Sequence, residues 1–123
     1  QSTDKEIPIM QAISVEDMGA VEFAKEYEDV SDYFILDTST SLVKGVGASG
    51  KVHDWNVSKA IVDSVKIPVV LAGGLSPENV REAIERVKPW GVDSLTHTNK
   101  TLDDGNFVKD IIKVREFFIN ATR

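Results

Sequence analysis

The sequence predicts an α/β protein whose parallel sheet is built from four consecutive βα units. Three observations indicate this fold class: four short apolar runs recur, each is followed by a helical pattern, and the runs start roughly 25 to 35 residues apart, the size of one βαβ unit. The runs are Ile7–Ile13, Tyr33–Leu36, Ile67–Ala72 and Gly91–Leu95. Strands that alternate with helices form parallel sheets covered by those helices.

Composition restricts the classes of protein to consider. The chain has 123 residues, 41% of them hydrophobic and 28% charged, as in a soluble globular domain. The net charge of −6 argues against a nucleic-acid surface, and the chain has no apolar run long enough for a membrane span. Because cysteine is absent and histidine occurs twice, disulfides and thiolate metal sites are excluded and no metal centre is expected. A cytoplasmic location fits these properties.

The first helix is expected to follow the first strand closely. Ser14 can cap it, with Asp17 three residues later in a capping-box arrangement. Apolar residues then recur at helical spacing at Val21, Phe23, Ala24 and Tyr27.

Capping residues and prolines also indicate where the later helices begin and end. Ser76 can cap the helix that follows the third strand, Pro77 suits its first position, and Pro89 ends it. A last helix is expected from Phe107 to Ile119, with a face too apolar to be left in water.

A long glycine-containing stretch follows the second strand. "TSTSLVKGVGASGKVH", residues 38–53, is longer than an ordinary βα connection. Long loops in compact domains often close over a ligand, which in parallel α/β folds lies at the carboxyl ends of the strands.

Asp37 ends the second strand. Strand alternation places it on one face with Tyr33 and Ile35. A carboxylate at the carboxyl end of a parallel strand can act as a general acid or base. It can equally cap the following loop by accepting hydrogen bonds from residues 38–40, and the strand pattern leaves both interpretations open.

Two glycines follow the third strand, in "VVLAGGLSPENV". Gly73 and Gly74 stand where a buried strand leads into a capped helix, a place where backbone N–H groups can bind a phosphate. A plain tight turn also uses glycine, and the glycine pair taken alone favours that interpretation; the buried strand before it and the capped helix after it support phosphate binding.

Four blocks of sequence carry a resemblance to a known family. "FILD", "GASGKVHDW", "VVLAGGLSPENVREAI" and "KPWGVD" resemble, in order and spacing, the C-terminal half of the phosphoribosylanthranilate isomerase family. The resemblance covers nearly the whole chain and implies a (β/α)₈ TIM barrel, of which residues 1–123 would be one segment that supplies strands five to eight.

The resemblance also implies a reaction and roles for residues. The family converts N-(5'-phosphoribosyl)anthranilate by an Amadori rearrangement in tryptophan biosynthesis, without metal or organic cofactor. Asp37 would protonate the ribose ring oxygen as general acid, and Gly73 and Gly74 would bind the substrate phosphate. Gly47, Gly50 and Lys51 would border and cover the site.

Two departures from the family pattern bear on function. The family's general base, a cysteine, and the arginine that binds the anthranilate carboxylate both come from the N-terminal half. This chain is therefore expected to be inactive alone and to need an N-terminal half-barrel chain or self-association. After the fourth strand "SLTHTNK" replaces the usual Val-Ser-Ser-Gly-Val-Glu, so Thr96 replaces one hydroxyl and His97 stands where glycine is usual.

Two alternatives remain open, the first of them because of the second departure. One is a barrel of the same kind that binds another sugar phosphate. The other is a non-catalytic half-barrel that serves as an assembly module, since four βα units leave two open sheet edges.

Overall fold

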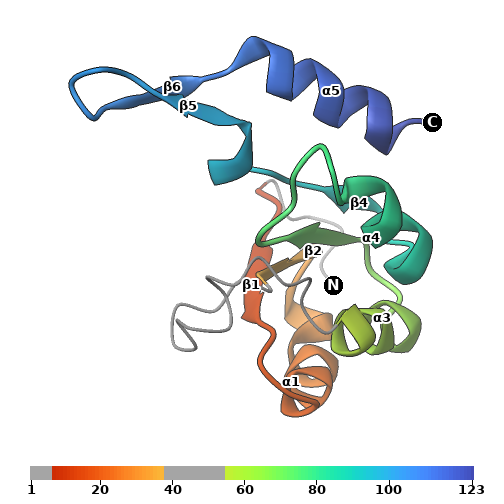
Figure 1. The fold of residues 1–123 in the computed structure, drawn as a ribbon. Helices are drawn as coiled ribbons and strands as arrows, with labels where there is room; N and C mark the ends of the chain where they lie inside the picture. Colours follow the sequence, from red (N-terminus) through yellow and green to blue (C-terminus); the bar gives the residue numbers. More distant parts are fainter. Residues whose placement is uncertain (1–6, 38–54) are drawn as a thin grey trace.

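A four-stranded parallel sheet forms the centre of the molecule (Figure 1). The computed structural model describes residues 7–37 and 55–123. The strands are β1 (Met10–Ser14), β2 (Tyr33–Asp37), β3 (Val69–Ala72) and β4 (Gly91–Val92), and they lie in chain order. The predicted α/β class with a parallel sheet is confirmed.

The strands coincide with the predicted apolar runs, but they begin or end at different residues from those predicted. β1 begins at Met10 rather than Ile7, although the carbonyl oxygen of Ile9 already accepts hydrogen bonds from the N–H groups of Asp32 (2.8 Å) and Tyr33 (3.2 Å). β4 is shorter than predicted and ends at Val92, because the chain then turns into a 3₁₀ helix, η2 (Thr96–Thr98).

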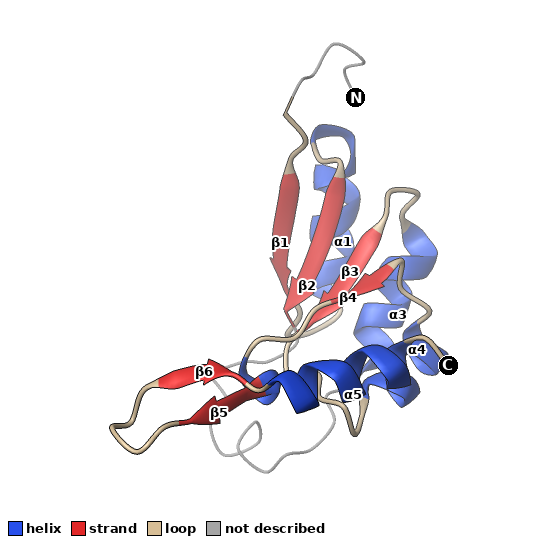
Figure 2. Cartoon of the chain, turned by 90° about the horizontal axis from the view of Figure 1, so that it is seen from above, coloured by secondary structure: helices blue, strands red, loops and turns tan. Residues whose placement is uncertain are grey.

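Three helices cover one face of the sheet (Figure 2). They are α1 (Gly19–Tyr27), which a short 3₁₀ turn η1 (Glu28–Val30) follows, α3 (Trp55–Ser64) and α4 (Val80–Val87). Side chains alternate along each strand, so those that point to the helices form the core, among them Ile13, Phe34, Leu36 and Leu71, none more than 2% exposed. On the opposite face of β1, Met10 is 52% exposed.

The cap predicted for the first helix is wrong. Ser14 is the last residue of β1, and its hydroxyl donates to Glu16 Oε2 at 3.2 Å. Asp17 lies next to the helix start instead, where its Oδ1 accepts the N–H of Gly19 at 2.8 Å. The helix begins later than the sequence suggests, so the residue two positions before it supplies the acceptor.

The signals around α4 are confirmed in part: Pro77 is not its first residue, because the helix begins at Val80. Ser76 Oγ accepts the N–H of Asn79 at 3.3 Å, and Asn79 Oδ1 accepts the N–H of Ser76 at 2.9 Å. This reciprocal pair is a capping box at the turn that leads into the helix. At the other end the helix stops at Val87, and Lys88 adopts a left-handed conformation with φ 56° directly before Pro89.

The segment after β4 differs most from prediction. Residues 107–109 form a strand, β6 (Phe107–Lys109), which pairs antiparallel with β5 (Asn99–Thr101). The connecting turn contains Gly105 at φ 88°, and Asp104 Oδ1 accepts the N–H of Asn106 at 2.9 Å. The turn returns the chain as a hairpin, so the expected helix cannot begin at Phe107.

The last helix, α5 (Ile111–Ala121), lies against α4 (Figure 2). The Arg81 guanidinium of α4 donates to the carbonyl oxygens of Ala121 (3.2 Å) and Arg123 (2.8 Å). On its other side four large apolar side chains are at least half exposed: Ile111 (63%), Ile112 (62%), Phe118 (65%) and Ile119 (50%). The expectation that this face is covered is therefore wrong for the chain by itself.

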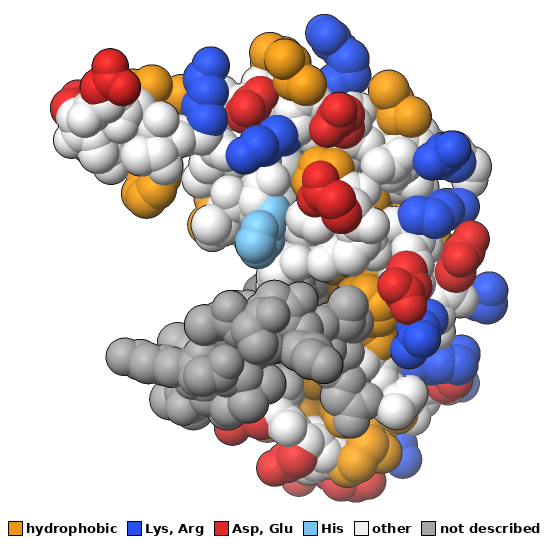
Figure 3. Space-filling view, viewed as in Figure 1, with side chains coloured by type: hydrophobic (Ala, Val, Ile, Leu, Met, Phe, Trp, Pro, Cys, Tyr) orange, Lys and Arg blue, Asp and Glu red, His pale blue; other side chains and the backbone are white. Residues whose placement is uncertain are grey.

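Hydrophobic side chains lie among charged ones on the surface that includes α5 and the hairpin (Figure 3). Within the described ranges, the helices are too short or too polar to cross a membrane.

Candidate active site at the carboxyl ends of the strands

Parallel pairing brings the carboxyl ends of β1, β2 and β3 to one edge of the sheet. In this register Ser14 pairs with Asp37, and Asp37 pairs with Ala72. Asp37 is exposed at the end of β2, and its carbonyl oxygen accepts the N–H of Val15 at 3.1 Å. Asp37 therefore lies at the edge where the carboxyl ends of the strands meet.

The glycine pair begins one residue beyond that register position. Gly73 and Gly74 have φ values of 93° and 74°. Residues with a Cβ atom adopt this left-handed region only at a cost in free energy. The carbonyl oxygen of Gly74 accepts a hydrogen bond from Asn79 Nδ2 at 3.0 Å, which fixes the turn to the start of α4. The structure thus brings Asp37, Gly73 and Gly74 together on neighbouring strands.

The start of α4 already uses several of its own N–H groups. The N–H of Ser76 donates to Asn79 Oδ1, and the N–H groups of Asn79 and Val80 donate to the carbonyl oxygen of Ser76 at 3.2 and 3.0 Å. These three amides are therefore engaged within the turn that leads into α4.

The residues predicted after the fourth strand lie in η2. Thr96 and His97 are both exposed there. Ser94 connects this segment to the one that follows the glycine pair, because its hydroxyl donates to the carbonyl oxygen of Leu75 at 2.9 Å. The two predicted phosphate-binding segments are therefore neighbours.

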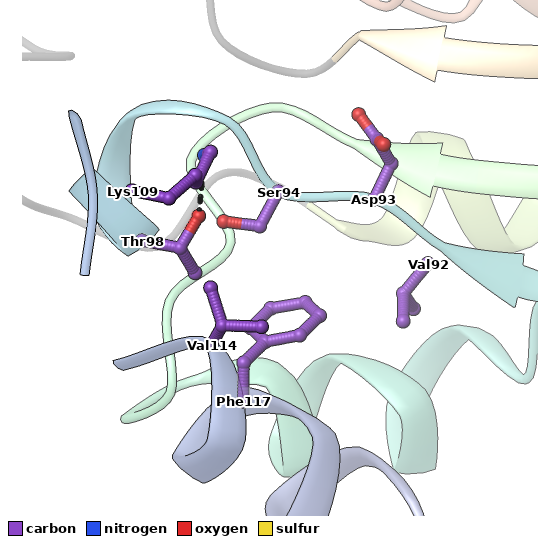
Figure 4. Close-up of a pocket in the computed structure, with 7 residues that line it drawn as sticks. All are labelled: Val92, Asp93, Ser94, Thr98, Lys109, Val114 and Phe117. Atoms are coloured by element: carbon purple, nitrogen blue, oxygen red, sulfur yellow. Dashed lines mark hydrogen bonds between the residues drawn. The ribbon is translucent and has the colours of Figure 1, made fainter. Parts of the chain in front are cut away.

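A cavity of about 330 Å³ lies between the end of β4 and α5 (Figure 4). Its apolar side is formed by Val92, Val114 and Phe117. Its polar lining consists of Asp93, Ser94, Thr98 and Lys109.

Sequence reasoning missed Lys109 and Thr98. Lys109 Nζ donates to the carbonyl oxygen of Leu95 at 2.6 Å and to Thr98 Oγ1 at 2.8 Å, the bond drawn in Figure 4. The contact joins residues 11 to 14 positions apart through a hairpin that was not predicted, so no local pattern signals it.

Three other predicted residues, Gly47, Gly50 and Lys51, lie outside the described residues. In the part of the chain that the structure describes, no three His, Asp or Glu side chains are grouped so that they could hold a metal ion.

Comparison with known proteins assigns this arrangement to a family. The family model for N-(5'-phosphoribosyl)anthranilate (PRA) isomerase matches residues 1–120. The chain belongs to the PRA isomerase family. Among curated relatives, N-(5'-phosphoribosyl)anthranilate isomerase 2 of Methanosarcina mazei is 44% identical over 121 residues, which are 98% of this chain and 52% of the relative. The Methanocella arvoryzae isomerase is 42% identical over 90% of this chain and 49% of its own length.

Solved PRA isomerase structures resemble this fold. The crystal structure of the Thermotoga maritima enzyme superposes with a TM-score of 0.75 at 32% identity, over 95% of this chain and 52% of that one. Another PRA isomerase structure, a complex with reduced 1-(o-carboxyphenylamino)-1-deoxyribulose 5-phosphate, matches with a TM-score of 0.68 at 27% identity, over 95% of this chain and 50% of that one. The chain spans about half the length of the curated relatives it matches.

Proposed function

We propose that this chain is the C-terminal half of a (β/α)₈ barrel that isomerises N-(5'-phosphoribosyl)anthranilate in cytoplasmic tryptophan biosynthesis. The observation that carries the proposal is the register that brings Asp37 beside Ala72 and the glycine turn, in a chain that matches the PRA isomerase family over residues 1–120. The Amadori rearrangement moves protons between carbon, oxygen and nitrogen, so it needs an acid and a base and no cofactor.

Asp37 is the proposed general acid. The reaction begins with opening of the ribose ring, which requires a proton on the ring oxygen as the C–O bond breaks. Asp37 is exposed at the carboxyl edge of β2, the edge at which the substrate is proposed to bind. The second proton transfer, from carbon, needs a base that the N-terminal half supplies in this proposal.

Gly73 and Gly74 are the proposed phosphate-binding residues. Their left-handed conformations form a turn whose two residues have no side chains of their own, which favours close approach of a phosphate to the backbone. The turn leads directly into α4, whose dipole would add to the attraction of an anion there.

The remaining contacts come from two loops. Thr96 and His97 are proposed to complete the phosphate site, since Ser94 holds their segment next to Leu75. Gly47, Gly50 and Lys51 are proposed to border and cover the substrate, on the strength of the family resemblance.

The exposed apolar surfaces support a need for a second half. β1 and β4 are the outer strands of the sheet, each with neighbours on one side. Met10 near one edge, and Ile111 and Phe118 of α5 beyond the other, are each more than half exposed. Burial of these residues by an N-terminal half-barrel would stabilise the assembly, with each fully buried side chain contributing about 1.5–3 kcal/mol. The chain alone is proposed to be inactive.

One observation favours a second candidate function, a barrel that acts on another sugar phosphate. His97 stands where the family pattern has glycine, and its side chain is exposed beside the proposed phosphate site. Failure of the completed barrel to convert phosphoribosylanthranilate, together with binding of a different sugar phosphate, would favour this candidate.

The acid role is tested in the completed barrel with Asp37→Asn. The amide has nearly the same shape and cannot donate an acidic proton, so turnover in the fluorescence assay for isomerase activity should fall by about 10²- to 10⁴-fold. Glu78→Gln, an exposed carboxylate before α4, is the matched control and should retain activity. Full activity of Asp37→Asn would refute the assignment.

A further inference from the structure

Lys109 holds the turn that carries Thr96 and His97. Its ammonium donates to the carbonyl oxygen of Leu95 at 2.6 Å and to Thr98 Oγ1 at 2.8 Å, and so joins the two ends of that turn. The Thr98 hydroxyl itself donates to the carbonyl oxygen of Leu95 at 3.2 Å. The three groups therefore form a closed hydrogen-bonded triangle. Figure 4 draws one of its sides, the bond between Lys109 and Thr98.

Two further donors from the same region reinforce the attachment. The N–H of Asp110 donates to the carbonyl oxygen of Thr98 at 2.9 Å, and Lys113 Nζ donates to the carbonyl oxygen of Asn99 at 2.9 Å. Thr98 is only 4% exposed, while Thr96 and His97 on the other side of the turn are exposed. The turn is thus fixed on its inner side and free to meet a ligand on its outer side.

The charge of Lys109 is directed to neutral acceptors. Both atoms that it contacts, a carbonyl oxygen and a hydroxyl oxygen, are uncharged. Within residues 7–37 and 55–123, the ion pairs found on α3 and α4 do not include Lys109. Its positive charge therefore remains available to attract an anion near the turn.

We propose that Lys109 is a positioning residue for phosphate binding: it holds the Thr96–Thr98 turn beside the Gly73–Gly74 turn and adds a positive charge there. Ser94 completes the link, because its hydroxyl joins the same segment to Leu75, directly after the glycine pair. The inference rests on the proposed function and concerns a residue that does not itself take part in proton transfer.

The test is a titration of the chain with inorganic phosphate, followed by the backbone amide signals in NMR spectra. Lys109→Met should shift the signals of residues 95–98 before phosphate is added and weaken phosphate binding by about tenfold. Lys109→Arg, which keeps the charge and the donors, should restore binding to within a few-fold. Lys100→Met removes the same charge from an exposed position on the hairpin and should bind phosphate as the wild type does.

The results distinguish failure of the proposed Lys109 role from failure of the proposed phosphate site. Wild-type phosphate affinity in Lys109→Met would overturn the role of Lys109 and leave the glycine site intact. Equal losses in Lys109→Met and Lys100→Met would overturn it too, since general charge would then explain both. Absence of a saturable response at Gly73 and Gly74 in the wild type would refute the phosphate site itself and this inference with it. If Lys109→Met does not fold, Lys109→Gln, which keeps a neutral donor, takes its place with the same expected loss.

Discussion

Replacement of Gly73 by alanine tests whether the glycine turn binds phosphate or is a plain turn. Gly73 has φ 93°, outside the region that an L-residue adopts without strain. Alanine there should destabilise the fold by about 1–2 kcal/mol, which is roughly a 5- to 30-fold change in the folding equilibrium. Its methyl group also stands where a phosphate would approach the backbone, so phosphate binding should weaken beyond what the strain explains.

Gly105 provides a closely matched control. Its φ is 88°, and an added Cβ would have no heavy atom within 4 Å apart from those of Gly105 and its two chain neighbours. Gly105→Ala should therefore carry a similar backbone strain, on the hairpin and away from the glycine turn. Urea denaturation followed by circular dichroism measures the two losses of stability, and the phosphate titration measures the two affinities.

The comparison separates strain from binding. We expect both variants to lose stability and Gly73→Ala alone to lose phosphate affinity. If both variants bind phosphate equally well, the glycines serve the turn and the phosphate-binding role is refuted.

Two further predictions concern α5. Asp110 Oδ1 accepts the N–H groups of Ile112 (3.0 Å) and Lys113 (3.4 Å). Asp110→Ala should therefore lower the free energy of unfolding, measured in urea, by about 0.5–2 kcal/mol, whereas Asp110→Asn should retain most of the wild-type stability. Equal stability of the two variants would contradict this cap. Phe118 is 65% exposed, so Phe118→Ser should change the stability of the isolated chain by less than about 0.5 kcal/mol. The same substitution should weaken association with an N-terminal half-barrel in sedimentation, whereas Glu116→Ser should not; unaltered association of Phe118→Ser would remove α5 from the interface.

The central fold could be predicted because its signals are local. β2 and β3 are short apolar runs that end at turn residues, and the α4 segment combines a capping box, a helical period and a following proline. The C-terminal segment could not be predicted in the same way. Phe107 and Val108 fit a helical pattern and a strand equally well, and the hairpin turn and the Asp110 cap decide between them.

The residues of the candidate site differ in the same way: some have local sequence signals and others depend on distant contacts. Asp37 and the glycine pair could be proposed from their positions at the ends of strands, since parallel strands place such residues at one edge. The role of Lys109 depends on a hairpin and on contacts across 11 to 14 residues, so it became visible only in the structure. Ser94 is similar, because its acceptor lies 19 residues away.

The most direct test of the central claim is the isomerase fluorescence assay on this chain mixed with the N-terminal half of the Methanosarcina mazei relative. That relative is 44% identical to this chain over 52% of its own length, so its remaining half is a suitable partner. We predict that neither half converts phosphoribosylanthranilate alone and that the mixture does. Activity of this chain alone, or an inactive mixture in which the two halves are shown to associate, would contradict the proposal.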